Sequence, residues 1–232
     1  TQTLQKASGY PLLLGVDQEG GVVSSFRVPG ATLFPGNPAL GAVGDAQLAR
    51  DVGRAVGAEL AYAGLNLDFA PVVDVFSTPK NPIIGTRSFG ADPHAVGRLG
   101  AAFAAGLGDS GVAAVAKHFP GHGGTAADSH EELPVVETGR EELEDLELLP
   151  FRTLIDAGVP AVMSAHVVYP ALDGQPATLS RPILTGLLRR ELGYEGVVVT
   201  DALNMRAITE NYGPGEAAVR SVQAGADLLL TV

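Results

Sequence analysis

Residues that can carry acid–base or covalent chemistry follow one apolar run after another in this 232-residue sequence. Carboxylates and imidazoles exchange protons with substrates, and a carboxylate or an amine can also attack an electrophilic carbon. A single polar residue after an apolar run could cap the next helix, but five runs that end this way indicate a shared polar centre. The residues are Asp17, Asp74, Lys117, His118, His166 and Asp201.

The segment Lys117–His130, KHFPGHGGTAADSH, holds the densest set of such groups. Its histidines and Asp128 suggest a metal site, which would need His118 and His122 on one face of a helix. Pro120 and the glycines around it make a helix unfavourable there, so we expect no metal ion. The segment also lacks the Gly-Lys-Ser/Thr ending of a phosphate-binding loop.

The end of this segment, Asp128-Ser129-His130, places a carboxylate and an imidazole two residues apart. In an extended backbone these two side chains lie on the same side of the chain. A carboxylate beside an imidazole fixes its tautomer and tunes its proton affinity. The pattern therefore favours an oriented, proton-transferring histidine over a glycine-rich loop with solvated histidines.

Four residues, two of them among the candidates above, also have structural interpretations. Asp68 and Asp74 fit hydrogen-bonded partners in the core as well as they fit chemistry. His166 and Met163 are expected to pack near the centre of the fold rather than to react.

Six short apolar runs predict buried strands, because strands covered on both faces are apolar nearly throughout. They are Leu12–Val16, Leu65–Val73, Val112–Ala116, Ala161–His166, Gly196–Thr200 and Ala226–Val232. Capping residues predict the helices between them. Asp45 opens Ala46–Ala63, Asp92-Pro93 opens a second helix, Thr138-Gly139-Arg140-Glu141 has capping-box spacing, Ser180 opens a fourth helix, and Glu216–Ala224 forms the last.

This alternation of strands and helices predicts parallel strands joined by right-handed crossovers, in a barrel or a doubly wound sheet. In a (β/α)8 TIM-type barrel, the loops that hold the candidate residues would gather at the carboxyl-terminal face. We expect residues 1–232 to be one α/β domain with about six strands of an incomplete barrel. Because the sequence opens on Thr1 and closes inside an apolar run, we expect the protein to continue past both ends.

The composition excludes several classes of protein. Lys and Arg number 15 against 26 Asp and Glu, and the net charge of −11 repels nucleic-acid phosphates. The sequence has no cysteine, which excludes disulfides, thiolate metal sites and a cysteine nucleophile and fits a reducing compartment. No apolar run reaches the roughly 18 residues that a membrane span needs. We expect a cytoplasmic protein with neither a membrane span nor a nucleic-acid partner.

Motifs along almost the whole chain resemble glycoside hydrolase family 3 and occur in the family's order. The motifs are DQEGG (Asp17–Gly21), FPGN, LDFAPVVDV, RSFG, KHFPGHG followed by DSH, VMSAHV, PATLS and GVVVTDALNM. KHFPGHG with DSH at this spacing is the most specific, and it resembles the β-N-acetylhexosaminidase branch, which includes a bacterial enzyme of cell-wall recycling. The resemblance implies a (β/α)8 barrel.

The resemblance also implies roles for individual residues. Asp201 matches the nucleophile that forms a covalent glycosyl-enzyme, and His130 matches an acid/base whose partner is Asp128. The residues that match holders of the sugar are Asp17, Arg87, Lys117 and His118. No cofactor is implied. One position departs, because the family commonly has Arg eight positions after Asp17, where this chain has Ser25; Arg27 is a possible substitute.

We therefore expect a retaining exo-glycosidase that removes terminal β-linked N-acetylglucosamine from a small saccharide during peptidoglycan turnover. A phosphorylase or a β-glucosidase-like member of the same family remains an alternative. A sugar-binding barrel with a decayed site is the alternative from another class, although Asp201, Asp128 and His130 are all present. An aldolase barrel would use Lys117 as a Schiff-base residue, but the neighbouring His118 and the carboxylates fit sugar binding better.

Overall fold

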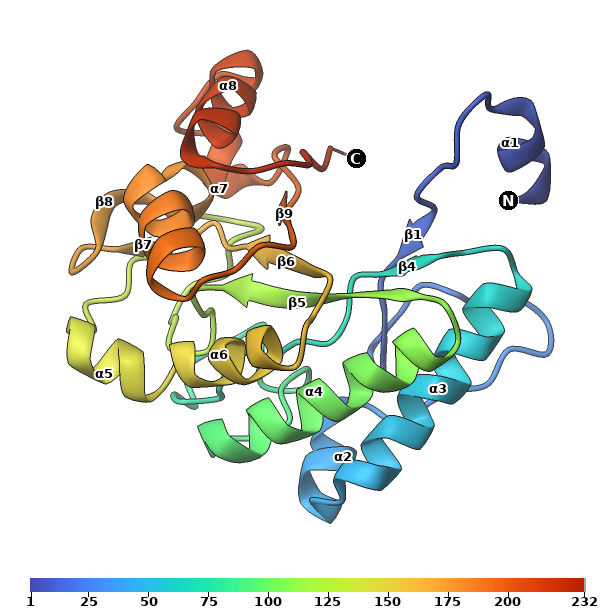
Figure 1. Ribbon diagram of the computed structural model, residues 1–232. Coiled ribbons are helices and arrows are strands. Elements are labelled where there is room, and N and C mark those ends of the chain that lie inside the picture. The colour runs from blue at the N-terminus through green and yellow to red at the C-terminus, as the bar shows by residue number, and fades with distance from the viewer. Residues whose placement is uncertain (232) are drawn as a thin grey trace.

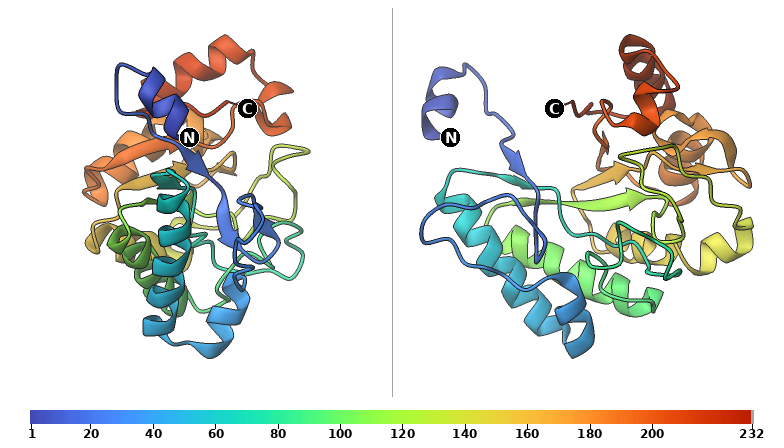
Figure 2. Two further views of the ribbon diagram at one scale, coloured as in Figure 1. Left: turned by 90° about the vertical axis from the view of Figure 1, so that its right-hand side faces the viewer. Right: turned by 180° about the vertical axis from the view of Figure 1, so that it is seen from behind.

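The computed structural model describes residues 1–231 and shows a curled, parallel sheet with helices on its outer side. The five strands pair in the order β1-β4-β5-β6-β9 (Figure 1). They are β1 (Gly15–Val16), β4 (Leu67–Asp68), β5 (Ala113–Phe119), β6 (Ala161–Ser164) and β9 (Val197–Thr200). Figure 2 shows that both termini lie on the open side of the curl, away from the helices below the sheet. The predicted α/β part-barrel is confirmed.

The sixth predicted strand runs beside β9 but pairs with it only in part. The Thr200 amide donates to the Leu228 carbonyl at 3.0 Å, and Val199 and Leu228 form a single parallel bridge. The predicted end of this strand, Val232, lies outside the described residues. The other strands lie at the predicted apolar runs, although β1, β4 and β6 are shorter than their runs and β5 continues past its run to Phe119.

Two long helices pack against the sheet and begin as predicted. They are α3 (Ala46–Tyr62) and α4 (Pro93–Asp109). The carboxylates of Asp45 and Asp92 accept amide hydrogens of the first turn at 2.8 and 3.0 Å, which satisfies donors that have no partner within the helix. No helix among residues 1–231 is long and apolar enough to cross a membrane.

The capping box predicted at Thr138–Glu141 is wrong. The residue before α5 (Arg140–Asp145) is Gly139, which has no side chain to cap the helix, and Thr138 lies one position too early. Ser180 does act at a helix start, since its Oγ accepts the Ile183 amide hydrogen at 3.2 Å. The other helices are α1 (Gln2–Ala7), α2 (Asn37–Val43), α6 (Leu148–Asp156), η1 (Ala177–Leu179), η2 (Pro182–Glu191), α7 (Arg206–Thr209) and α8 (Pro214–Ala224).

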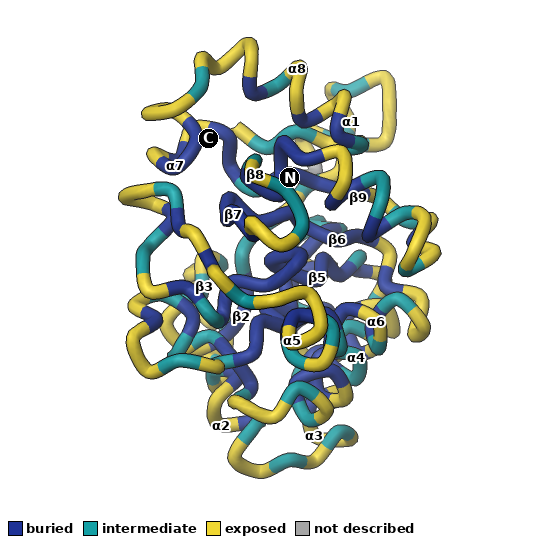
Figure 3. Tube along the Cα trace, turned by 90° about the vertical axis from the view of Figure 1, so that its left-hand side faces the viewer, coloured by how far each residue is buried: buried dark blue, intermediate teal, exposed yellow. Residues whose placement is uncertain are grey.

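Two short antiparallel hairpins, which the apolar pattern does not predict, follow strands of the sheet. The first pairs β2 (Gln18–Gly20) with β3 (Val23–Ser24) directly after β1. The second pairs β7 (Val168–Tyr169) with β8 (Asp173–Pro176) after β6. The hairpins therefore extend the chain beyond the carboxyl ends of the parallel strands. Figure 3 shows the central strands β5 and β6 buried, with both buried and exposed segments of chain around them.

The strands decide which residues face the inside of the curl, because alternate residues of a strand point to opposite faces. Ala116 packs into the main core with the helices, whereas Val115 and Val199 belong to a smaller cluster on the other face. Two residues further along the chain come Lys117, still within β5, and Asp201, directly after β9. The alternation thus directs both of them toward the inner face at the carboxyl end of the sheet.

The helices α3 and α4 approach each other through glycines. A Cβ at Gly53 would overlap the Phe103 carbonyl oxygen, and a Cβ at Gly106 would overlap the Arg50 carbonyl oxygen. These contacts leave no room for a side chain, so the two helices lie closer than helices with larger residues could.

This close approach predicts opposite effects for two substitutions on α4. Gly106→Ala should lower the free energy of unfolding by at least about 2 kcal/mol, because backbone must move to admit the methyl group. Gly108→Ala, where nothing lies within 4 Å of the new Cβ, should raise it by about 0.5–1 kcal/mol through helix propensity. Urea unfolding of both variants measures the difference. Equal effects would contradict the backbone contact.

Candidate active site

The carboxyl ends of the strands surround a cavity of about 700 Å³. Six of the seven residues predicted for the site line it. They are Asp17, Arg87, Lys117, His118, His130 and Asp201. The seventh, Asp128, contacts His130. The structure therefore brings together residues that are up to 184 positions apart in the sequence, from Asp17 to Asp201 (201 − 17 = 184).

A chain of alternating charges forms one wall of the cavity. The Lys117 ammonium group is buried and contacts Asp17 Oδ1 at 2.6 Å and Glu19 Oε1 at 2.8 Å. Glu19 in turn accepts two hydrogen bonds from the Arg87 guanidinium, at 2.8 and 2.9 Å. A buried ammonium group and a buried carboxylate are tolerated when each has opposite charges beside it.

Glu19 is the site residue that the sequence motif contains but that sequence reasoning did not single out. Burial acts to raise its pKa, but Lys117 and Arg87 outweigh burial and lower the pKa to about 2. For Lys117, burial acts to lower the pKa, and Glu19 and Asp17 outweigh it and raise it. Both groups are therefore charged at neutral pH. The spacing of Asp17 and Glu19, two residues apart beside β2, is the signal that places both carboxylates near one cation.

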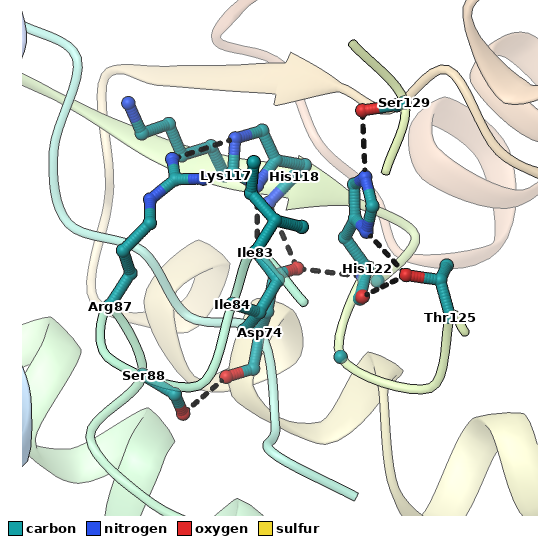
Figure 4. A network of polar contacts seen from close by, with 12 residues as sticks. Asp74, Ile83, Ile84, Arg87, Ser88, Lys117, His118, His122, Thr125 and Ser129 are labelled. Atoms are coloured by element: carbon teal, nitrogen blue, oxygen red, sulfur yellow. Dashed lines mark hydrogen bonds and ion pairs between the residues drawn. The ribbon is translucent and has the colours of Figure 1, made fainter. Parts of the chain in front are cut away.

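His118 is held by Asp74 behind the cavity wall (Figure 4). Its ring Nδ1 lies 2.7 Å from Asp74 Oδ2, and Asp74 Oδ1 accepts the amide hydrogens of His118 and His122 at 3.1 and 2.8 Å. Burial raises the pKa of Asp74 to about 6 and lowers that of His118 well below its ordinary value. At neutral pH a neutral His118 donates through Nδ1, so its Nε2 faces Arg87 Nη2, 3.4 Å away, as an acceptor.

Asp201 follows β9 and lines the cavity, where hydrogen bonds fix it in place. Oδ1 accepts the Ala202 amide hydrogen at 2.7 Å, and the Asp201 amide donates to the Ser164 carbonyl at 3.2 Å. Burial acts to raise the pKa of Asp201, but His166, His118 and the Ala202 amide outweigh it, so the pKa lies below its ordinary value. The group is an ionised carboxylate in a fixed position, which is what a nucleophile requires.

His166 packs behind Asp201, as the sequence predicts. The ring is fully buried, with Nδ1 at 2.9 Å from Thr178 Oγ1 and Nε2 at 3.0 Å from the Ala202 carbonyl. Burial lowers its pKa, so the ring is neutral and Nε2 carries the hydrogen that the carbonyl accepts. His166 therefore holds the backbone that carries Asp201.

Asp128 and His130 form the predicted pair at the rim. Asp128 Oδ1 accepts the His130 amide hydrogen at 2.8 Å and lies 2.7 Å from His130 Nδ1. Burial acts to raise the pKa of Asp128, but the two hydrogen bonds from His130 outweigh it and lower the pKa. The ionised Asp128 carboxylate orients the His130 ring. The His130 side chain is 56% exposed. Among residues 1–231, no group of three or more His, Asp or Glu side chains is arranged to hold a metal ion.

Ser25 lines the cavity, and Arg27 does not substitute there for the arginine that the family commonly has at position 25. Arg27 is exposed, and its Nε donates to the Ser24 carbonyl at 2.7 Å. Ser25 is bound through its amide to the Asp17 carbonyl at 2.9 Å. This side of the cavity is therefore lined by a short hydroxyl side chain rather than by a cation.

Two further carboxyl groups are buried near the site: Asp68, for which the sequence left a structural and a chemical role open, and Glu147, which the sequence analysis did not single out. Asp68 accepts the Gln18 amide hydrogen through Oδ1 at 2.9 Å, which makes it a structural partner of the segment after β1. Glu147 lies under the Gly121–Gly124 turn and accepts a hydrogen bond from Ser77 Oγ at 3.4 Å. Burial raises the pKa of Glu147 to about 8, and the nearby charge of Asp74 adds to the effect.

Comparison with known proteins gives a consistent family. The model of the glycosyl hydrolase family 3 N-terminal domain matches residues 1–232. Beta-hexosaminidase A of Pseudoalteromonas piscicida is 43% identical over 97% of this chain and 40% of its own length. Beta-hexosaminidase of Thiobacillus denitrificans is 42% identical over 95% of this chain and 62% of its own length. The chain thus spans less than two thirds of these relatives.

Solved structures show the same fold. A glycoside hydrolase family 3 beta-N-acetylglucosaminidase from Paenibacillus sp. superposes with a TM-score of 0.96 and 52% identity, over 99% of this chain and 44% of that one. NagZ from Neisseria gonorrhoeae, solved in complex with N-trifluoroacetyl-D-glucosamine, gives a TM-score of 0.85 and 40% identity, over 95% of this chain and 65% of that one.

The buried Glu147 predicts that the protein loses stability as pH rises. Its folded-state pKa of about 8 exceeds the ordinary value of 4.5, so the folded state holds a proton that the unfolded state releases. This contribution is complete below pH 4.5 and is lost between there and about pH 8. Glu147→Gln should therefore flatten the decline in urea midpoint between pH 5 and 8. Glu142→Gln, at an exposed position on α5, is the control, and a parallel decline in both variants would contradict the prediction.

Proposed function

This chain belongs to glycosyl hydrolase family 3, and from that premise we propose that residues 1–232 are the catalytic barrel domain of a retaining, exo-acting β-N-acetylglucosaminidase. One observation carries the proposal. The ionised Asp201 carboxylate and the Asp128-paired His130 line the same cavity. The relatives are β-hexosaminidases and β-N-acetylglucosaminidases by name, which supports this sugar as the substrate.

In the proposed reaction, Asp201 attacks the anomeric carbon while His130 donates a proton to the departing glycosidic oxygen. The bond to the leaving group breaks and a covalent glycosyl-enzyme ester forms at Asp201. His130, now deprotonated, takes a proton from water, whose oxygen attacks the anomeric carbon and releases Asp201. Two displacements at one carbon retain its configuration.

The charged wall of the cavity supplies the sugar contacts in this scheme. Asp17 has a 45% exposed side chain and can accept hydrogen bonds from sugar hydroxyls, while the Lys117 beside it is buried and donates. The Arg87 guanidinium, which is held by Glu19 and by Nε2 of His118, can offer its remaining N–H donors to the sugar. These groups are fixed by their ion pairs before a sugar arrives, so binding costs little further ordering.

We further propose that the natural substrates are peptidoglycan fragments and that the protein acts in the cytoplasm. The DSH loop, which resembles that of cell-wall recycling enzymes, supports the first, and the lack of cysteine supports the second. Hydrolysis of N-acetylglucosaminyl muropeptides and of chitin-type oligosaccharides, compared in kcat/KM, distinguishes the two substrate classes. The same assays with added phosphate separate a hydrolase from a phosphorylase, because only the latter forms a sugar phosphate.

Asp201→Asn should abolish turnover while sugar binding remains. The substitution keeps the shape of the side chain but removes its nucleophilic charge, so kcat should fall by more than about a thousandfold. A slowly deglycosylating fluoro-sugar should label the unsubstituted protein at Asp201, as mass spectrometry of peptides would show. Asp156→Asn, an exposed aspartate at the end of α6, should have no effect. Label on another carboxylate, or inversion at the anomeric carbon, would refute this assignment.

His130→Ala should affect substrates in proportion to their need for a proton. General acid catalysis contributes about 10²–10⁴-fold, so the loss should be of that order for unactivated saccharides and far smaller for aryl glycosides with acidic leaving groups. Asp128→Asn should show the same pattern to a lesser degree, because it removes the charge that orients the ring. Equal losses on both kinds of substrate would mean that another group donates the proton.

A further inference from the structure

His122 is a buried histidine that, like Ser129, lines the cavity but has no part in the proposed reaction. It is 2% exposed, and both of its ring nitrogens have partners. Nδ1 lies 2.9 Å from Thr125 Oγ1, and Nε2 lies 2.9 Å from Ser129 Oγ (Figure 4). Ser129 stands between Asp128 and His130, so this ring reaches the middle of the loop that carries the proposed acid/base.

The backbone on the His122 side of this contact is held firmly. Its amide donates to Asp74 Oδ1 at 2.8 Å, and its carbonyl accepts from Asn81 Nδ2 at 2.7 Å. The next residue is equally confined, since a Cβ at Gly123 would overlap the Val75 carbonyl oxygen. His122 is therefore attached to the same buried carboxylate that holds His118.

The loop on the Ser129 side has fewer attachments. Residues 121–134 contain no helix or strand, and the His130 side chain is exposed. Ser129 is 2% exposed, and besides its bond to His122 its carbonyl accepts the Ala207 amide hydrogen at 3.3 Å. Ser129 thus anchors the loop at two points, one to the His122 ring and one to α7.

We propose that His122 is a positioning residue, whose hydrogen bond to Ser129 holds the Asp128–His130 pair over the Asp201 carboxylate. This inference rests on the proposed function. Its catalytic consequence is that the acid/base is placed by a rigid, buried imidazole rather than by the loop itself.

The chemistry of the ring suits this role. Burial lowers the pKa of His122, so the ring is neutral and has one donor and one acceptor nitrogen. Thr125 Oγ1 donates its hydrogen to the His122 carbonyl at 3.1 Å, so it accepts the hydrogen on Nδ1, and Nε2 accepts the hydrogen of the Ser129 hydroxyl. The ring also packs edge-on against His118, with 5.7 Å between centroids. Because both nitrogens are occupied, His122 has no free site from which to transfer a proton to substrate.

Ser129→Ala removes only the hydroxyl and is the sharpest test of the proposal. We expect kcat for an unactivated N-acetylglucosaminyl saccharide to fall about 10- to 100-fold, within the range of general acid catalysis, with little change for an activated aryl glycoside. In a His130→Ala background, Ser129→Ala should have no further effect, because the group it positions is gone. Ser221→Ala is the matched control: Ser221 is buried, and its Oγ donates to the Ala217 carbonyl within α8.

Amide hydrogen exchange tests the contact without any substrate. In Ser129→Ala the amides of residues 129–132 should exchange faster, while those of β5 stay unchanged. Equal kinetic losses on both substrates, additivity with His130→Ala, or unchanged exchange would each overturn the positioning role. If the unsubstituted protein hydrolyses no N-acetylglucosaminide, the proposed function fails and the catalytic consequence falls with it. Exchange then still decides whether the His122–Ser129 bond holds the loop.

Discussion

The buried carboxylate of Asp74 is the constraint on which the arrangement of the site depends. A carboxylate without contact with water is tolerated only when hydrogen-bond donors surround it. Asp74 obtains them from the amides of His118 and His122 and from the His118 ring. Satisfying this one group fixes the chain at both ends of the segment HFPGH, so one histidine faces the sugar pocket and the other faces the loop with the proposed acid/base.

The charges of the cavity are arranged so that Asp201 remains available. Asp17, Lys117, Glu19 and Arg87 alternate in sign and neutralise one another through contacts of 2.6–2.9 Å. Asp201 accepts an amide hydrogen instead, and no ion pair within the described residues includes it. Neighbouring dipoles and cations stabilise its negative charge without forming an ion pair with it. A carboxylate in that condition is ionised yet still nucleophilic.

Local signals in the sequence predict what local physics determines. The Asp45 and Asp92 caps, the apolar strands and the polar residues at strand ends all lie where the pattern places them, because each depends on a few neighbouring residues. The capping box at Thr138 fails because α5 begins after Gly139, one residue later than the box requires. The role of Glu19 was not predicted, because it depends on Lys117, which lies 98 residues further along the chain (117 − 19 = 98). Which distant residues become neighbours depends on the order of the strands in the sheet, and the apolar pattern of the sequence does not determine that order.

The site divides into a rigid part and an adjustable part, and the division follows from chain topology. Lys117 and His118 belong to β5, which has a paired strand on each side. Asp17 and Asp201 directly follow β1 and β9, and the Ser164 carbonyl of the neighbouring strand holds the Asp201 amide. His130 instead lies on a loop without regular structure, at a rim where its side chain is exposed. A proton donor must approach a leaving group whose size varies between substrates, whereas the nucleophile always meets the same anomeric carbon. Because His130 lies on a loop, it can adjust to leaving groups of different size. The hydrogen bond from that loop to the buried His122 ring keeps His130 within reach of the glycosidic oxygen.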